Sequence, residues 1–159
     1  MGRVDANKGC ADLFEYFLRV ARTRPHPLTL VLLGRAAMEV PDDPRIRHLG
    51  FVSEEEKADA LAGATALVLP SLFESLSIAV LEAWACGRPV LVNGRCDVLR
   101  GQCLRANGGL FYDGPDEFAE AARLLLENDT LATRLGRNGQ EYCRQEYAWP
   151  VIERKYQSM

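Results

Sequence analysis

Short apolar runs alternate along the chain with longer segments of helical periodicity. The runs are nearly continuous in branched apolar residues, and most of them stop at glycine, proline or asparagine, which is typical of buried strands. The predicted strands are residues 28–33, 46–52, 65–69, 89–92 and 109–112. The predicted helices are residues 9–22, a segment opening at Ser53, and residues 78–85, 115–127, 131–147 and 149–156.

Strands that alternate with helices over short connections predict an α/β fold. The apolar strands predict a Rossmann-like, doubly wound parallel sheet with helices on both faces. Residues 2–9 are interpreted as the end of a strand and a loop into the first helix, and residues 93–103 as a polar loop. The whole chain, residues 1–159, is predicted to be one domain.

Composition narrows the class of protein. The chain is 48% hydrophobic and 26% charged, with a net charge of −3, so a surface built for nucleic acid is not expected. No apolar run reaches the roughly 20 residues of a membrane span, and no signal peptide opens the chain, which predicts a cytoplasmic location. Five cysteines without paired CxxC spacing predict reduced thiols and no zinc site.

Ligands of doubly wound sheets bind where strands end and helices begin. The first such loop carries Arg3 and Lys8 ahead of a helix N-terminus, where amide donors and the helix dipole favour an anion. Its spacing matches neither a Walker A loop nor GxGxxG. Two solvated surface cations are the alternative interpretation. The loop at residues 93–103 could line the same cleft or be a solvated polar loop.

The loop after the third predicted strand carries the strongest signal. Glu74 precedes a helix that Ser75 or Ser77 could cap, so its carboxylate lies near unpaired amides. Glu82 is the single charge on the apolar segment 78–86. Because such a helix is normally buried, Glu82 needs hydrogen-bond donors. A bound ribose diol would supply them; the alternative is a structural ion pair with an arginine.

Four stretches of the sequence resemble the C-terminal domain of retaining GT-B glycosyltransferases of family 4. They are Gly2-Arg3 with Lys8-Gly9, the segment 50–52, the segment from Glu74 to Val90 (including Gly87-Arg88-Pro89-Val90), and the segment 107–110. The resemblance covers the whole chain in order. It implies a domain that binds a nucleoside diphosphate sugar, with UDP, GDP or ADP as the nucleotide.

The resemblance also implies roles for individual residues. Arg3 and Lys8 would hold the donor pyrophosphate, and Glu74 would be the catalytic residue, contacting sugar hydroxyls and stabilising the charged transition state. The backbone amides of Leu76, Ser77 and Ile78 would meet the sugar and phosphate, and Glu82 would hold the ribose. The transfer would retain anomeric configuration and need no metal and no cofactor. The family pattern Gly-Phe-Gly-Leu after the first glutamate is here Ser-Leu-Ser-Ile, which leaves less room beside the sugar.

Enzymes of this type bind the acceptor in an N-terminal domain, so the chain is interpreted as a fragment that lacks that domain. The isolated chain is expected to bind the donor weakly and to be inactive. The full-length enzyme could associate peripherally with a membrane. Two alternatives stay open, a nucleotide-sugar epimerase of the same architecture and a non-catalytic nucleotide-binding module.

Overall fold

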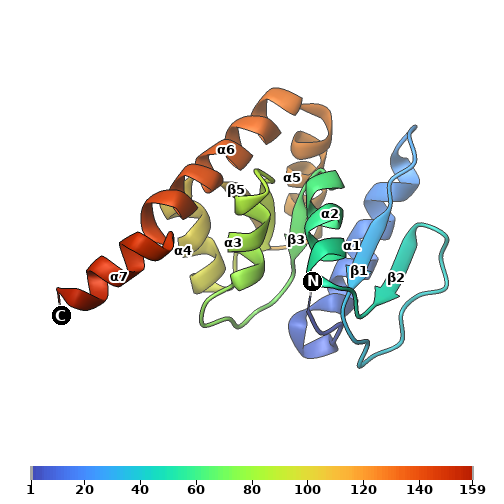
Figure 1. The fold of residues 1–159 in the computed structure, drawn as a ribbon. Helices are drawn as coiled ribbons and strands as arrows, with labels where there is room; N and C mark the ends of the chain where they lie inside the picture. The colour runs from blue at the N-terminus through green and yellow to red at the C-terminus, as the bar shows by residue number, and fades with distance from the viewer. Residues whose placement is uncertain (1, 159) are drawn as a thin grey trace.

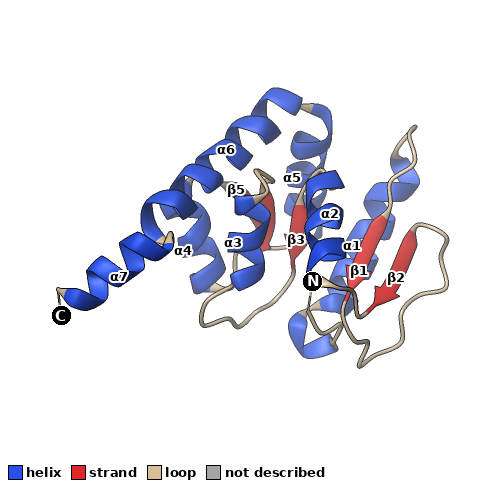
Figure 2. Cartoon of the chain, viewed as in Figure 1, coloured by secondary structure: helices blue, strands red, loops and turns tan. Residues whose placement is uncertain are grey.

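The computed structural model describes residues 2–158; Met1 and Met159, the ends of the predicted domain, lie outside the described residues (Figures 1 and 2). Strands and helices alternate, as predicted. In chain order they are η1 (Ala6–Lys8), α1 (Cys10–Thr23), β1 (Leu30–Leu33), β2 (Ile46–Gly50), α2 (Glu54–Gly63), β3 (Leu67–Leu69), α3 (Ile78–Ala85), β4 (Val90–Asn93), α4 (Asp97–Ala106), β5 (Gly109–Tyr112), α5 (Pro115–Glu127), α6 (Asp129–Glu146) and α7 (Trp149–Gln157).

All strand pairs are parallel, which confirms the predicted α/β class. The strands form two hydrogen-bonded groups, β1–β2 and β3–β4–β5, where one continuous sheet was expected. Between residues 2 and 158 no ladder joins β1 to β3. The predicted strand end at residues 2–4 contributes a single parallel bridge, from Val4 to Ala36.

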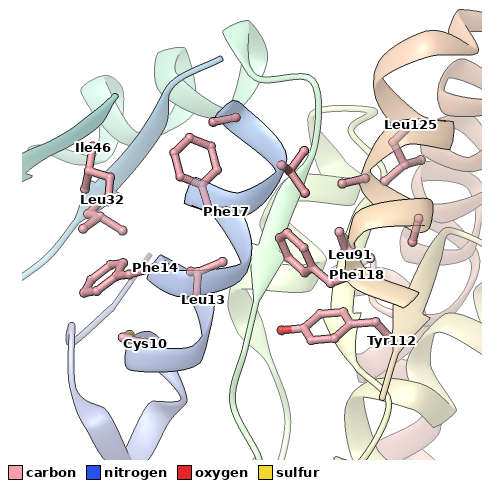
Figure 3. Packing of buried hydrophobic residues seen from close by; sticks show 14 of the residues in the cluster. Cys10, Leu13, Phe14, Phe17, Leu32, Ile46, Leu91, Tyr112, Phe118 and Leu125 are labelled. Carbon is pink, nitrogen blue, oxygen red and sulfur yellow. The ribbon is translucent and has the colours of Figure 1, made fainter. Parts of the chain in front are cut away.

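Helices cover both faces of the strands, and successive residues of β4 belong to buried clusters on opposite faces. Leu91 of β4 belongs to one buried cluster, and its neighbours Val90 and Val92 belong to the other. The first cluster is covered by α1 and α5, and the second by α2, α3 and α4. In Figure 3, α1 lies between Leu32 of β1 on one side and Leu91 on the other, so a single helix packs on both strand groups.

The helix ends follow the sequence signals. Ser53 Oγ accepts the amide N–H of Glu56, and the Glu56 carboxylate accepts the amide N–H of Ser53, which completes the predicted capping box. Pro115 opens α5 in its first turn, where its missing N–H costs nothing. In the centre of the fold, Trp84 is fully buried and donates its indole N–H to Gly108 O over 2.8 Å.

One expectation was wrong. The polar loop predicted at residues 93–103 is largely α4, whose face with Leu99, Gln102 and Cys103 is buried. Arginine, glycine and glutamine separate the apolar positions of this segment, so its sequence pattern does not reveal the buried stripe. Trp149 is 75% exposed, and α7 leads away from the rest of the fold (Figure 1). The five cysteines are free thiols.

Candidate functional site

Two loops meet closely at the carboxyl ends of the strands. Gly9 ends η1 with φ of 74°, and a Cβ built there would lie 2.4 Å from Pro70 O. Only glycine therefore lets the α1 N-terminus approach the loop after β3. Asn93 of β4 fixes the same loop by donating its side-chain N–H to Pro70 O over 3.0 Å. The ends of β3 and β4 and the start of α1 thus come together at the carbonyl of Pro70.

Lys8 and Glu74, two of the residues selected from the sequence, form an ion pair across this junction. Lys8 Nζ donates to Glu74 Oε1 over 2.9 Å, although 66 residues separate them in the chain. The Glu74 side chain is 17% exposed and the Lys8 side chain 38%, so the pair is reachable from solvent but partly dehydrated. A cation and a carboxylate are therefore held together at the mouth of the site.

Arg3 lies nearby with a different partner. Its Nε contacts Asp5 Oδ2 at 2.9 Å, and the other carboxylate oxygen of Asp5 accepts the amide N–H of Asn7. Asp5 is buried, and its contacts with Arg3 and Asn7 hold the loop before α1 together. The sequence reasoning missed this role of Asp5, which the N-cap preference for aspartate ahead of a helical turn could have indicated.

The N-terminus of α3 lies beside the Lys8–Glu74 pair. Ser77 is buried and its Oγ accepts the amide N–H of Val80, so its hydroxyl serves as the helix cap. Leu76 and Ile78 on either side are exposed. Amides of a first helical turn have no partner within the helix, and here Leu76, Ser77 and Ile78 line the same cavity as Lys8 and Glu74. The predicted segment 76–78 thus presents backbone donors and two apolar side chains.

Glu82 does not lie in the environment that the sequence suggested. Its helix is buried on one face only, because Ile78 is 64% exposed, and the Glu82 side chain itself is 31% exposed. Its Oε1 accepts a hydrogen bond of 2.7 Å from Lys57 of α2. The alternative of an ion pair is thus realised, with a lysine in place of the expected arginine. Whether Glu82 also meets a ligand stays a prediction.

Lys57 was not selected from the sequence. It bridges two carboxylates, with Nζ 2.6 Å from Glu54 and 2.7 Å from Glu82. Its hydrogen bonds to Glu54 first and Glu82 second raise the pKa of Lys57 above its usual value. In the sequence, only the i,i+3 spacing from Glu54 to Lys57 indicated an ion pair of Lys57. Its contact with Glu82 spans 25 residues, so the local sequence does not indicate it.

Six of the seven predicted site residues line one cavity of about 910 Å³. They are Arg3, Lys8, Glu74, Leu76, Ser77 and Ile78. Glu82 lies outside that lining, further along α3. Within residues 2–158 no cluster of three or more His, Cys, Asp or Glu side chains is arranged to hold a metal ion. No helix of the described chain is long and apolar enough to cross a membrane.

Comparison with known proteins identifies relatives of this arrangement. The family model of glycosyl transferases group 1 matches residues 1–128. The chain is 35% identical over 117 residues to D-inositol 3-phosphate glycosyltransferase of Nocardioides sp., covering 70% of this chain and 24% of that protein. It is 33% identical over 174 residues to alpha-maltose-1-phosphate synthase of Mycobacterium tuberculosis, covering 96% of this chain and 44% of that protein. The chain thus spans less than half the length of these relatives.

A solved structure shares the fold at lower identity. The Anabaena protein HepE, crystallised in complex with UDP, superposes with a TM-score of 0.81 at 18% identity. The match covers 99% of this chain and 47% of HepE. At this level of identity the likeness shows the fold, and it agrees with the two-face arrangement of helices described above.

Proposed function

The chain belongs to the glycosyl transferases group 1 family, and we propose on that premise that it is the donor-binding domain of a sugar-transferring enzyme. The donor is a nucleoside diphosphate sugar with UDP, GDP or ADP as the nucleotide. The observation that carries the proposal is the Lys8–Glu74 ion pair beside the N-terminus of α3. HepE, solved with UDP, has the same fold and supports a nucleotide site of this kind.

A diphosphate fits the groups around the cavity mouth. Arg3 and Lys8 supply two cations, and the first turn of α3 supplies amide donors with the positive end of a helix dipole. When the phosphate oxygens attract Lys8, one oxygen of Glu74 becomes available to accept hydrogen bonds from sugar hydroxyls. The ion pair is therefore a preassembled contact for both halves of the donor.

Glu82 is proposed to accept hydrogen bonds from the ribose diol. Lys57 bonds its Oε1, which leaves Oε2 outside that bond and orients the carboxylate. A hydrogen bond to a charged group contributes about 1.5–3 kcal/mol. Glu82 lies along α3 from Ser77, so a nucleotide whose phosphates lie at the helix start would extend its ribose along the helix.

The proposed reaction exchanges one bond at the anomeric carbon. The bond to the phosphate oxygen breaks, the bond to the acceptor oxygen forms on the same face, and the acceptor proton leaves with the diphosphate. Glu74 would stabilise positive charge on the sugar, while Arg3, Lys8 and the α3 dipole would stabilise the departing diphosphate. Retention and independence from metal ions are part of this proposal, as is the absence of any cofactor.

The acceptor is proposed to bind in an N-terminal domain of the full-length enzyme. This chain alone would then bind donor and transfer nothing. A cytoplasmic location is proposed as well, and the five free thiols support it, because disulfides are rare in that compartment. Peripheral association of the full-length enzyme with a membrane stays a prediction.

A titration of this chain with UDP, GDP and ADP tests the proposal through the melting temperature. One nucleotide is expected to raise it, since a ligand at about 100 times its Kd stabilises by about 2.7 kcal/mol. Glu82→Ala should abolish most of that shift. Glu153→Ala, an exposed carboxylate on α7, is the matched control and should retain the whole shift.

Equal and negligible shifts with all three nucleotides, in a folded sample, would refute the donor-binding role. In the full-length enzyme, NMR of the product anomer tests retention, and transfer in excess EDTA tests metal independence. Turnover by residues 1–159 alone would refute the assignment of the acceptor site to another domain.

A further inference from the structure

Asn93 ends β4 with a buried carboxamide that joins two loops. Its Nδ2 donates to Pro70 O over 3.0 Å, and its Oδ1 accepts the amide N–H of Arg95 over 3.0 Å. Because one partner is a carbonyl and the other an amide, turning the carboxamide over would place donor against donor and acceptor against acceptor. The backbone on both sides therefore fixes the orientation of the Asn93 side chain.

The bond to Pro70 lies directly beyond the last paired residues of β3 and β4. Leu69 pairs with Val92 in the parallel ladder, and Pro70 and Asn93 each follow one residue later. Proline has no N–H, so the chain after β3 cannot donate to the ladder at this position. The Asn93 side chain instead ties the Pro70 carbonyl to β4, and Gly9 approaches the same carbonyl closely.

The segment after Pro70 carries Glu74 and has few other attachments. No backbone–backbone hydrogen bond joins residues 71–76 to any other residue between 2 and 158. Within the same range, the bond from Lys8 to Glu74 is the one hydrogen bond made by a side chain of this segment. At the end of the segment, Ser77 caps α3. Three attachments therefore hold the segment, at its start, at its end and at Glu74 itself.

Asn93 does not line the cavity, whereas Pro70 and Glu74 do. An effect of Asn93 on a ligand would therefore pass through the Pro70 carbonyl. We propose that Asn93 is a positioning residue, which holds the start of the segment so that Glu74 stays within hydrogen-bond distance of Lys8. With the donor bound, the same placement would hold the Glu74 carboxylate at the sugar hydroxyls, and this second step rests on the proposed function.

The two halves of the donor should depend on Asn93 to different degrees. The proposed diphosphate contacts are Arg3, Lys8 and the first turn of α3, and none of them is hydrogen-bonded to Asn93. Glu74, the proposed sugar contact, lies four residues after the carbonyl that Asn93 holds. Loss of the Asn93 bond should therefore weaken binding of the sugar more than binding of the diphosphate.

The first test needs no ligand and follows the carboxyl carbon of Glu74 by NMR. Lys8→Met removes the ion pair and is expected to shift this resonance in the original chain. Asn93→Asp keeps a side-chain oxygen and replaces the donor to Pro70 by an acceptor. In that variant the shift caused by Lys8→Met should fall below about half of its original size, because the two residues are no longer held together.

Two further variants complete this test. Asn138→Asp is the matched control, because Asn138 Nδ2 donates to Asn107 O over 3.0 Å and neither residue lines the cavity. The full response of Glu74 should remain in it. Asn93→Ala removes the carboxamide without adding a charge, and it replaces Asn93→Asp if the buried aspartate prevents folding. A full response in a folded Asn93 variant would overturn the proposal.

The second test measures dissociation constants by calorimetry for UDP, GDP and ADP and for the glucose conjugate of each. The ratio of the two constants for one nucleotide reports the contribution of the sugar. Asn93→Asp should lower this ratio at least about fivefold and change the constant for the nucleoside diphosphate less than about twofold, because hydrogen bonds to the charged Glu74 are lost. Asn93→Asp combined with Glu74→Gln should lower the ratio no further than Glu74→Gln alone.

The results distinguish a failure of this positioning role from a failure of the proposed function. If the original chain binds none of the nucleotides, the donor-binding role is refuted, and the carboxyl resonance alone decides whether Asn93 positions Glu74. A ratio near one in the original chain would overturn the step from Glu74 to the sugar.

Equal losses for the nucleoside diphosphate and its conjugate in Asn93→Asp would overturn the proposal, because Asn93 would then only maintain the fold. Additive losses in the double variant would overturn it also, since Asn93 would then act on the sugar by a route other than Glu74.

Discussion

The surroundings of Trp84 and the cavity lined by β1 and β3 lie in the same fold and differ in how closely they are packed. Trp84 is fully buried, and glycines at 108 and 139 let two backbones approach its ring so closely that a Cβ at Gly139 would lie 2.1 Å from it. By contrast, Val31 of β1, which lines the cavity, is 44% exposed. One region has no room for a methyl group, and the other encloses a cavity of about 910 Å³.

The candidate site lies at the boundary of these regions. Glu74 and Ser77 follow β3 and precede α3, the helix that carries Trp84, whereas Arg3 and Lys8 precede α1, which lines the cavity. Glu74 and Ser77 are thus positioned by the closely packed helix α3. Arg3 and Lys8 are positioned by the approach of Gly9 to Pro70 and by the Lys8–Glu74 ion pair. Stability and ligand affinity should therefore respond separately to changes in the two regions.

The largest expected difference comes from Gly→Ala changes in the two regions. Gly139→Ala should destabilise the fold by about 3 kcal/mol, because the new methyl group meets the buried Trp84 ring. Gly63→Ala, at the end of α2 beside the cavity, meets no atom within 4 Å and should stabilise by up to about 1 kcal/mol through helix propensity. Urea unfolding of both variants gives the two free energies. Equal changes in the free energy of unfolding of the two variants would contradict the difference in packing between the two regions.

The next largest effect is expected at Lys8, one of the two cations of the site. Lys8→Met removes the charge paired with Glu74 and should weaken binding of the nucleoside diphosphate by about tenfold or more, from the loss of a charged hydrogen bond. The corresponding nucleoside without phosphates should bind the variant as it binds the original chain. Calorimetric titration measures both constants. A similar loss for the nucleoside would show that Lys8 acts by holding the loop rather than by meeting phosphate.

A smaller effect is expected at Lys57. Lys57→Met releases Glu82 from its hydrogen bond and should weaken nucleotide binding about threefold, because the carboxylate loses its orientation. Stability should fall by less than about 1 kcal/mol, since the pair is partly exposed. Glu54→Gln is the matched control: it removes the other partner of Lys57 and should leave affinity unchanged. An affinity increase in Lys57→Met would mean that the lysine competes with the ligand.

Sequence reasoning reached the fold class because periodicity and helix caps are local signals. Lys8 and Glu74 were selected separately, and their contact depends on Gly9 approaching Pro70, which no periodicity encodes. Glu82 illustrates the limit. Its isolation among apolar residues indicated burial, but the exposed face of α3 and the partner Lys57, 25 residues away, arise only in the folded chain.

The split sheet was likewise outside the reach of local patterns. Each strand was predicted from its own apolar residues, and all five were found. Which strands neighbour each other depends on crossovers, and the edge between β1 and β3 follows from the order of strands in space. The parallel bridge from Val4 to Ala36, and the cavity lined by β1 and β3, therefore required the structure.

The smallest expected effect is the acid sensitivity of β2, which pairs with the cavity-lining strand β1. Asp43, in the loop before β2, accepts three hydrogen bonds from Arg45, and the bonds from the Arg45 side chain are the main cause that lowers the pKa of Asp43 to about 2. A lowered folded-state pKa means stabilisation that is complete above the ordinary value near 3.8 and is lost as the pH falls toward 2. Amide exchange in β2 should therefore accelerate between pH 4 and pH 2, while exchange at Trp84 changes less. Asp43→Asn should remove this pH dependence, and an unchanged profile in that variant would assign the acid response to another carboxylate.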